Sequence, residues 1–170
     1  MKIGSIAAGH KTTVESAKNI LESGGNAFDA AVGAVFTSMV SEFTLTGPGG
    51  GGAFLAYPNE SEPILFDFFV DTPPPQPNKD LDFSNILIDF GSVNQEFHIG
   101  RGSVAVPGNT AGLLSVHERL GKLPLRAILE PAIDAARNGV ILNESHGYLM
   151  EILDPILTYT SAGKKLFTPE

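Results

Sequence analysis

The chain has 170 residues, the size of one ordinary domain, and its 42% apolar content suffices for a packed core, which excludes a wholly disordered chain. Eleven basic residues against 19 acidic ones give a net charge of −8, and no basic cluster exceeds Lys164–Lys165, so we expect no nucleic-acid partner. The absence of cysteine excludes disulfides, thiolate metal sites and a cysteine nucleophile.

The N-terminal segment is apolar and short over Ile3–Ala8, which predicts a strand. It is too short, and too broken by glycine, for the apolar core of a signal peptide. No apolar run approaches the roughly 20 residues that a membrane-spanning helix needs. We therefore expect a cytoplasmic protein that does not bind membranes.

Two helices are predicted next. Thr12 or Thr13 is expected to cap the first, which ends at the Gly24–Gly25 pair. Asn26 is expected to cap the second, in which large apolar residues recur at three- and four-residue spacing over 28–43 with small residues opposite. Because the second helix is apolar nearly all round, we expect it to lie at the centre of the fold.

The glycine run Gly49–Gly52 predicts a loop, and the apolar runs Ala53–Tyr57 and Ile64–Val70 predict a β-hairpin after it. By strand alternation, Phe69 lies on the face opposite Phe68.

Residues 72–82 hold four prolines and predict an extended excursion, after which strand patterns resume over 86–88 and 96–106. Helices are predicted over Pro107–Gly121, Pro124–Gly139 and Asn143–Pro155. Pro131 is expected to kink or divide the second of these helices.

The glycine run does not match a nucleotide-binding loop. A phosphate-binding loop continues with Lys and Ser or Thr into a helix, whereas a strand pattern follows here. A dinucleotide fingerprint runs from strand to helix, the reverse of this order. Two interpretations stay open: a tight turn under close packing, or a loop beside a ligand or a catalytic residue.

No other pattern completes a catalytic or metal site. The carboxylates of Glu130 and Asp134 are expected on a polar helix face, and no serine occupies a G-x-S-x-G elbow. The histidines, which show no metal-ligand spacing, are His10, His98, His117 and His146. From spacing alone we therefore expect no metal and no cofactor.

Several segments together resemble one family. Residues 7–10 read Ala-Ala-Gly-His, 24–32 read Gly-Gly-Asn-Ala-Phe-Asp-Ala-Ala-Val, and 47–54 read Gly-Pro-Gly-Gly-Gly-Gly-Ala-Phe. Residues 106–113 read Val-Pro-Gly-Asn-Thr-Ala-Gly-Leu, and 129–139 form a further helical block. In this order and spacing, the segments resemble the opening of the γ-glutamyltranspeptidases.

The resemblance implies an α+β fold, part of an αββα four-layer N-terminal-nucleophile hydrolase, with residues 1–170 as a single, incomplete domain of the large subunit. Such enzymes cut their own precursor, and the freed N-terminal threonine of the second chain attacks a small-molecule amide. No threonine here sits in a matching motif, so the resemblance implies no catalytic residue in this chain. The implied partner is the C-terminal segment, or small subunit, of the same precursor.

One position departs from the family pattern. The family carries an arginine that holds the α-carboxylate of the γ-glutamyl group, and Phe69 occupies the matching position. A phenyl ring cannot form a bidentate pair with a carboxylate, so we expect a different acyl group. Arg101, between Gly100 and Gly102, is either a surface residue or a ligand of an anionic substrate group.

The candidate pocket residues are therefore Phe69, Arg101, Gly49, Gly50, Gly51 and Gly52. Because the chain lacks a nucleophile, a non-catalytic binding or scaffold module is the alternative function.

Overall fold

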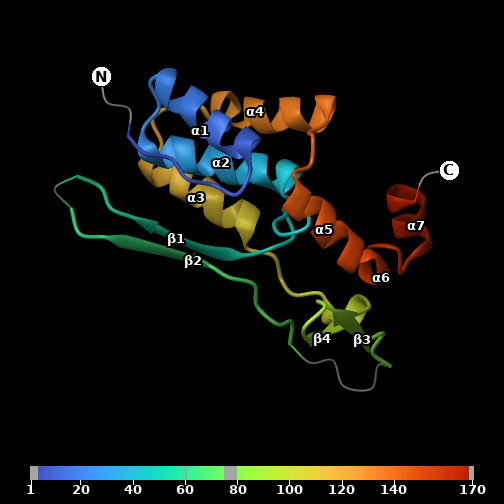
Figure 1. Cartoon of the computed structure of the whole chain (residues 1–170). Helices are drawn as coiled ribbons and strands as arrows, with labels where there is room; N and C mark the ends of the chain where they lie inside the picture. Colours follow the sequence, from blue (N-terminus) through green and yellow to red (C-terminus); the bar gives the residue numbers. More distant parts are fainter. Residues whose placement is uncertain (1–3, 60, 75–79, 169–170) are drawn as a thin grey trace. The chain divides into compact units, whose positions relative to one another are not determined.

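The computed structural model describes residues 4–59, 61–74 and 80–168 (Figure 1). The described residues combine helices with antiparallel strand pairs, as an α+β chain does. The chain divides into two compact units, Met1–Asp71 with Val106–Leu142, and Thr72–Ala105 with Asn143–Glu170. That residues 1–170 form one incomplete domain stays a prediction.

The first unit is a stack of helices on one side of a hairpin (Figure 1). Its elements are α1 (Lys11–Glu22), α2 (Ala27–Ser41), β1 (Gly52–Ala56), β2 (Ile64–Phe68), α3 (Asn109–Leu120) and α4 (Leu125–Asn138). The strands pair antiparallel, with Gly52 opposite Phe68 and Leu55 opposite Leu65. Helix α2 packs against α1, α3 and α4, which confirms its predicted central position.

The start of α1 differs from the prediction. His10 is the N-cap, and its Nδ1 accepts the Thr12 N–H at 3.1 Å, so a threonine cap was wrong. The opposite ring nitrogen, Nε2, donates to the Ile141 carbonyl oxygen at 3.1 Å. Thr13 lies inside the helix, where its hydroxyl is 2.8 Å from Glu42 Oε1. The imidazole of His10 therefore caps α1, where the sequence predicted a threonine hydroxyl.

The buried face of α2 consists mostly of small or polar side chains. Thr37 Oγ1 donates to Ser16 Oγ at 2.8 Å, and Ser41 Oγ lies 2.9 Å from Thr13 Oγ1, so these hydroxyls link α1 to α2. A side chain at Gly33 would meet Ile20 and the backbone of α4, since the three helices approach closely there. Among the larger apolar residues of α2, Val32 is fully buried, and the others are partly buried.

The buried carboxylate of Asp29 joins two parts of the first unit. It accepts the N–H of Asn26 at 2.9 Å, that of Lys122 at 2.9 and 3.1 Å, and that of Leu123 at 3.2 Å. Asn26 is the predicted N-cap of α2, and its Nδ2 donates to the Leu120 carbonyl oxygen at 2.6 Å. The start of α2 is thereby fixed to the turn between α3 and α4.

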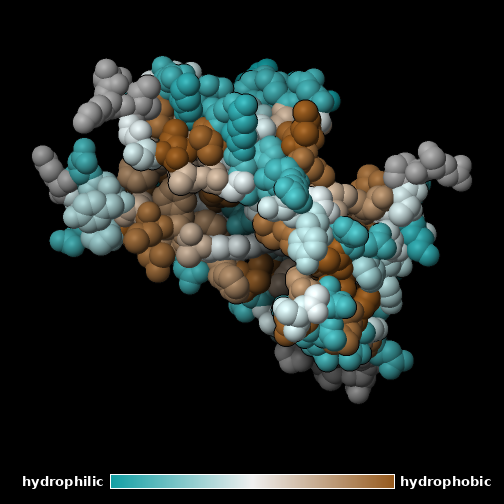
Figure 2. All heavy atoms as spheres, viewed as in Figure 1, coloured by the Kyte–Doolittle hydropathy of each residue, from teal (hydrophilic) through white to brown (hydrophobic). Residues whose placement is uncertain are grey.

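Both faces of the hairpin are apolar. The inner face carries Phe54, Phe66 and Phe68, which pack on the helical core. On the outer face, the paired Leu55 and Leu65 are 71% and 64% exposed. Figure 2 shows hydrophobic side chains gathered on the surface over β1 and β2.

Two further predictions for the first unit differ from the structure in whole or in part. Residues 4–8 form no strand, and residues 1–3 lie outside the described part; Ile6 packs against the helical core instead of pairing in a sheet. Helix α4 continues through Pro131, so the predicted division is wrong, and the alternative of a kink at Pro131 stays a prediction. The helix ends as predicted at Asn138, with Gly139 at a φ of 79°.

The second unit holds β3 (Ser84–Asp89), β4 (Asn94–Ile99), the 3-10 turn η1 (Arg101–Ser103), α5 (Glu144–Ile152), α6 (Asp154–Leu157) and α7 (Ser161–Phe167). The strand predicted over 96–106 ends at Ile99 because Gly100 turns the chain with a φ of 102°. Pro155 lies in the first turn of α6. Helix α7 was not predicted from the sequence. Thr160 caps it, with Oγ1 accepting the Gly163 N–H at 3.0 Å.

The prolines at 73 and 74 lie in irregular chain, as predicted, and those at 75 and 77 lie outside the described residues. Among the residues that the structure describes, no helix has the length and apolar character needed to cross a bilayer.

Replacing Asp29 tests the carboxylate junction. Asp29→Ala removes the shared acceptor of three backbone donors, and hydrogen bonds to a charged group contribute about 1.5–3 kcal/mol each. We expect the free energy of unfolding to fall by about 3 kcal/mol or more in urea denaturation. Asp134→Ala, which removes an exposed carboxylate of α4, is the matched control and changes it by less than about 0.5 kcal/mol. Equal losses in both variants would contradict the junction.

Candidate substrate-binding site

Three segments of the first unit meet at the glycine loop. The Gly50 carbonyl oxygen accepts the N–H groups of Gly108 and Asn109, both at 3.0 Å. Asp71, just beyond β2, and Val106, just before α3, exchange backbone hydrogen bonds of 2.7 and 3.3 Å. The loop over 47–52, the end of β2 and the start of α3 therefore form one connected structure.

Glycine is needed in this loop for close approach. A Cβ at Gly51 would press on the Val70 nitrogen and the Phe68 carbonyl oxygen, and one at Gly50 would lie 3.1 Å from Asn109 Nδ2. A Cβ at Gly49 would meet nothing within 4 Å, and none of the loop glycines has a φ in the left-handed region. Packing therefore explains Gly50 and Gly51 but not Gly49.

The same packing sets Phe68 against α3. Side chains at Gly108 and Gly112 would run into the backbone and the ring of Phe68, so both positions of the Val-Pro-Gly-Asn-Thr-Ala-Gly segment admit only glycine. Phe68 faces inward, and Phe69 faces outward with 72% of its surface exposed, which confirms the predicted alternation.

The structure brings Phe69 and the glycine loop together, because Gly51 packs on the Phe69 backbone. The Phe69 N–H donates to Asp67 Oδ1 at 3.1 Å, and the carboxylates of Asp67 and Asp71 are exposed on either side of it. No lysine or arginine occurs in residues 47–52, 67–72 or 106–110. The exposed Phe69 ring is therefore apolar, and the nearest charged residues along the chain, Asp67 and Asp71, are both acidic.

Arg101 belongs to the second unit and lies in η1 rather than on a strand. Its side chain is exposed, and its backbone N–H donates to Asp82 Oδ2 at 3.1 Å. Side chains at Gly100 and Gly102 would meet Asp82, so these glycines serve the local chain path.

The histidines have structural contacts. His10 and His117 bond backbone carbonyl oxygens, and His146 Nδ1 lies 2.7 Å from Asn143 Oδ1. His98 stacks on Phe83, with ring centroids 4.7 Å apart. In residues 4–59, 61–74 and 80–168, no group of three or more potential ligands gathers as a metal site would require.

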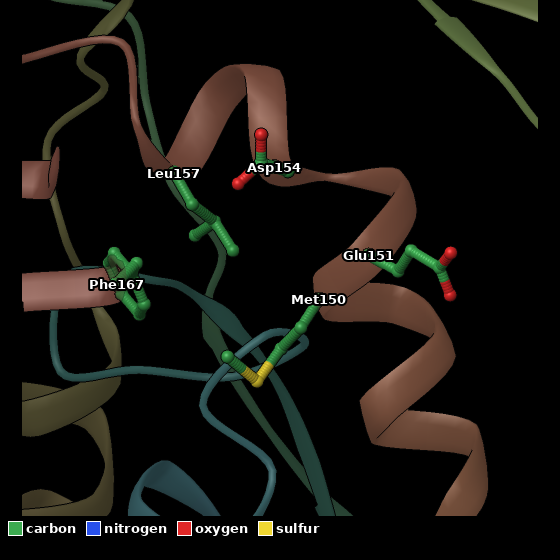
Figure 3. Close-up of a pocket in the computed structure, with 5 residues that line it drawn as sticks. All are labelled: Met150, Glu151, Asp154, Leu157 and Phe167. Carbon is green, nitrogen blue, oxygen red and sulfur yellow. The ribbon is translucent and has the colours of Figure 1, made fainter. Parts of the chain in front are cut away.

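A pocket of about 410 Å³ lies among α5, α6 and α7, and none of the predicted site residues lines it. Its lining residues are Met150, Glu151, Asp154, Leu157 and Phe167. Figure 3 shows the Glu151 carboxylate pointing away from the three apolar side chains. The lining of the pocket is mixed, since polar atoms, among them those of Asp154, lie beside the three apolar side chains.

Known proteins share this architecture. The Gamma-glutamyltranspeptidase family model matches residues 13–170. The chain is 35% identical over 137 residues to the glutathione hydrolase proenzyme of Pseudomonas aeruginosa, covering 80% of this chain and 24% of the relative. It is 30% identical over 150 residues to the capsule biosynthesis protein CapD proenzyme of Bacillus anthracis, covering 88% and 24%.

A solved γ-glutamyltranspeptidase from Pseudomonas nitroreducens, complexed with L-DON, superposes on all of this chain and 50% of its own, with a TM-score of 0.79 and 26% identity. The fold is thus that of the large-subunit portion of an N-terminal-nucleophile hydrolase. The chain belongs to the γ-glutamyltranspeptidase family. It spans about a quarter of the length of the curated relatives it matches.

Two glycine variants test the packing of the loop. Gly51→Ala forces backbone displacement and should lower the free energy of unfolding by about 1–3 kcal/mol in thermal denaturation, a cost typical of overpacking. Gly49→Ala, in open space, should change it by less than about 0.5 kcal/mol. Equal stability of the two variants would show that Gly51 is not required for close approach.

Proposed function

We propose that this chain is the N-terminal part of the large subunit of an amide hydrolase or acyltransferase whose acyl group lacks the carboxylate of a γ-glutamyl donor. Family membership supports the reaction class, since relatives include a glutathione hydrolase. The observation that carries the altered specificity is the exposed ring of Phe69 beside the glycine loop.

Electrostatics favour a neutral acyl group at Phe69. An anionic group there would meet the carboxylates of Asp67 and Asp71 and no cation from the three segments that form this place. Like charges that come close together repel, whereas an arginine would have supplied a charge-assisted pair. Phe69 instead offers apolar surface, which an aliphatic or aromatic acyl chain would cover.

The nucleophile lies outside this chain in the proposed enzyme. Self-cleavage of the precursor would free an N-terminal threonine, whose hydroxyl is activated by its own α-amine and attacks the amide carbonyl carbon. The amine leaves, and water or a second amine then releases the acyl group. This chain supplies the glycine loop and one wall of the pocket.

The remainder of the precursor is the proposed partner. Relatives are named proenzymes, and the outer face of β1 and β2 is apolar, as in a sheet that is covered on both sides. We expect the second chain to cover Leu55 and Leu65. The cytoplasmic location expected from the sequence stays a prediction.

Cleavage of the precursor distinguishes the proposed enzyme from a non-catalytic scaffold module. The intact mass of the full-length protein should resolve into two chains, the second beginning with threonine, because the nucleophile must be freed. Residues 1–170 alone should not hydrolyse γ-glutamyl-p-nitroanilide. A single uncleaved chain, without amidase activity, would favour the non-catalytic module.

Two substitutions in the full-length protein test the pocket residues. Phe69→Arg should raise kcat/KM for γ-glutamyl-p-nitroanilide relative to an apolar acyl p-nitroanilide at least tenfold, the effect of about 1.4 kcal/mol from a charge-assisted contact. If Arg101 binds an anionic substrate group, Arg101→Ala should raise KM about tenfold.

The controls are Ala136→Arg, which adds the same charge at an exposed position of α4, and Arg126→Ala, also on the exposed side of α4. Both controls should keep the parent's substrate ranking and KM. If Phe69→Arg and Arg101→Ala also keep them, neither residue touches substrate and the altered pocket is refuted.

A further inference from the structure

The geometry points to Asn109 as a positioning residue that holds the glycine loop, and through it the Phe69 backbone, against the first turn of α3. This inference rests on the proposed function only for its catalytic consequence. Asn109 is 6% exposed, so its amide is a buried polar group that needs hydrogen-bond partners.

The contacts of Asn109 fall on the turn that opens the loop. Its Nδ2 donates to the Gly47 carbonyl oxygen at 2.9 Å. The same oxygen accepts the Gly50 N–H at 3.1 Å, the bond that closes a β-turn over 47–50. Asn109 thus holds this turn from the side, with a donor that belongs to another element.

Backbone and side chain of Asn109 act on both ends of the turn. Its N–H, like that of Gly108, donates to the Gly50 carbonyl oxygen at 3.0 Å. The next residue, Gly51, packs on the backbone of residues 68–70. A displacement of the turn would therefore reach Gly51 and the chain at Phe69.

The side-chain bond is the part of this attachment that a substitution can remove. Asn109→Asp keeps the size of the side chain but replaces the donor with a carboxylate oxygen that faces the Gly47 carbonyl oxygen. Asn109→Leu keeps the branched shape with the same number of heavy atoms, adds no charge and leaves that oxygen without its side-chain donor. Asn138→Asp, at an exposed position at the end of α4, is the matched control.

The primary readout is hydrogen–deuterium exchange of the full-length protein, followed by mass spectrometry. Both Asn109 variants should speed exchange in peptides covering residues 45–53 at least tenfold, while peptides of α1 and α2 keep the parent's rates. Unchanged exchange over 45–53 in both variants overturns the inference. Equal acceleration in α1 and α2 also overturns it, because Asn109 would then only contribute to general stability.

Kinetics test the consequence at the site. The Asn109 variants should lower kcat/KM about tenfold on the acyl amide that the parent prefers, and Asn138→Asp should leave it unchanged. Faster exchange over 45–53 with unchanged kcat/KM would overturn the positioning role. A parent that hydrolyses no acyl amide would overturn the proposed function instead, and the exchange measurement alone would then decide whether Asn109 holds the loop.

Discussion

The buried carboxylate of Asp29 is the interaction on which the first unit depends. It sits at the start of the central helix α2 and binds backbone N–H groups of the turn between α3 and α4. Water is replaced there by fixed peptide donors, which is how a protein stabilises a buried charge. Since α3 also carries the contacts of the glycine loop, the position of α3 relative to α2 fixes where that loop lies.

The glycines of this family segment have one shared physical role in the structure. Gly51 and Gly108 pack on the backbone at Phe68, and Gly112 packs on the Phe68 ring. A side chain at any of the three positions would collide there, so the glycines allow the loop, β2 and α3 to approach closely. This contact, rather than a left-handed backbone, explains why the motifs around residues 50 and 110 occur together. It turns Phe68 inward and leaves Phe69 at the surface.

Much of the first unit could be predicted from the sequence, because its signals are local. Asn26 ahead of the apolar periodic run marks a helix start, and alternation places Phe68 and Phe69 on opposite faces. The His10 cap, the end of β4 at Gly100 and the buried role of Asn109 could not be predicted in this way. Asn109 is bonded to Gly47, 62 residues away, and the His10 ring is also held by the Ile141 carbonyl oxygen, 131 residues away. At Gly100 the sequence does not show that the φ is positive.

The central claim is that the loop, β2 and α3 together present Phe69 to a neutral acyl group. A crystal structure of the full-length, processed protein with a bound apolar acyl-amide analogue tests this claim most directly. The account predicts the acyl chain within about 4.5 Å of the Phe69 ring, an ordinary apolar contact. An acyl chain seated elsewhere, with Phe69 packed beneath another part of the protein, would contradict it.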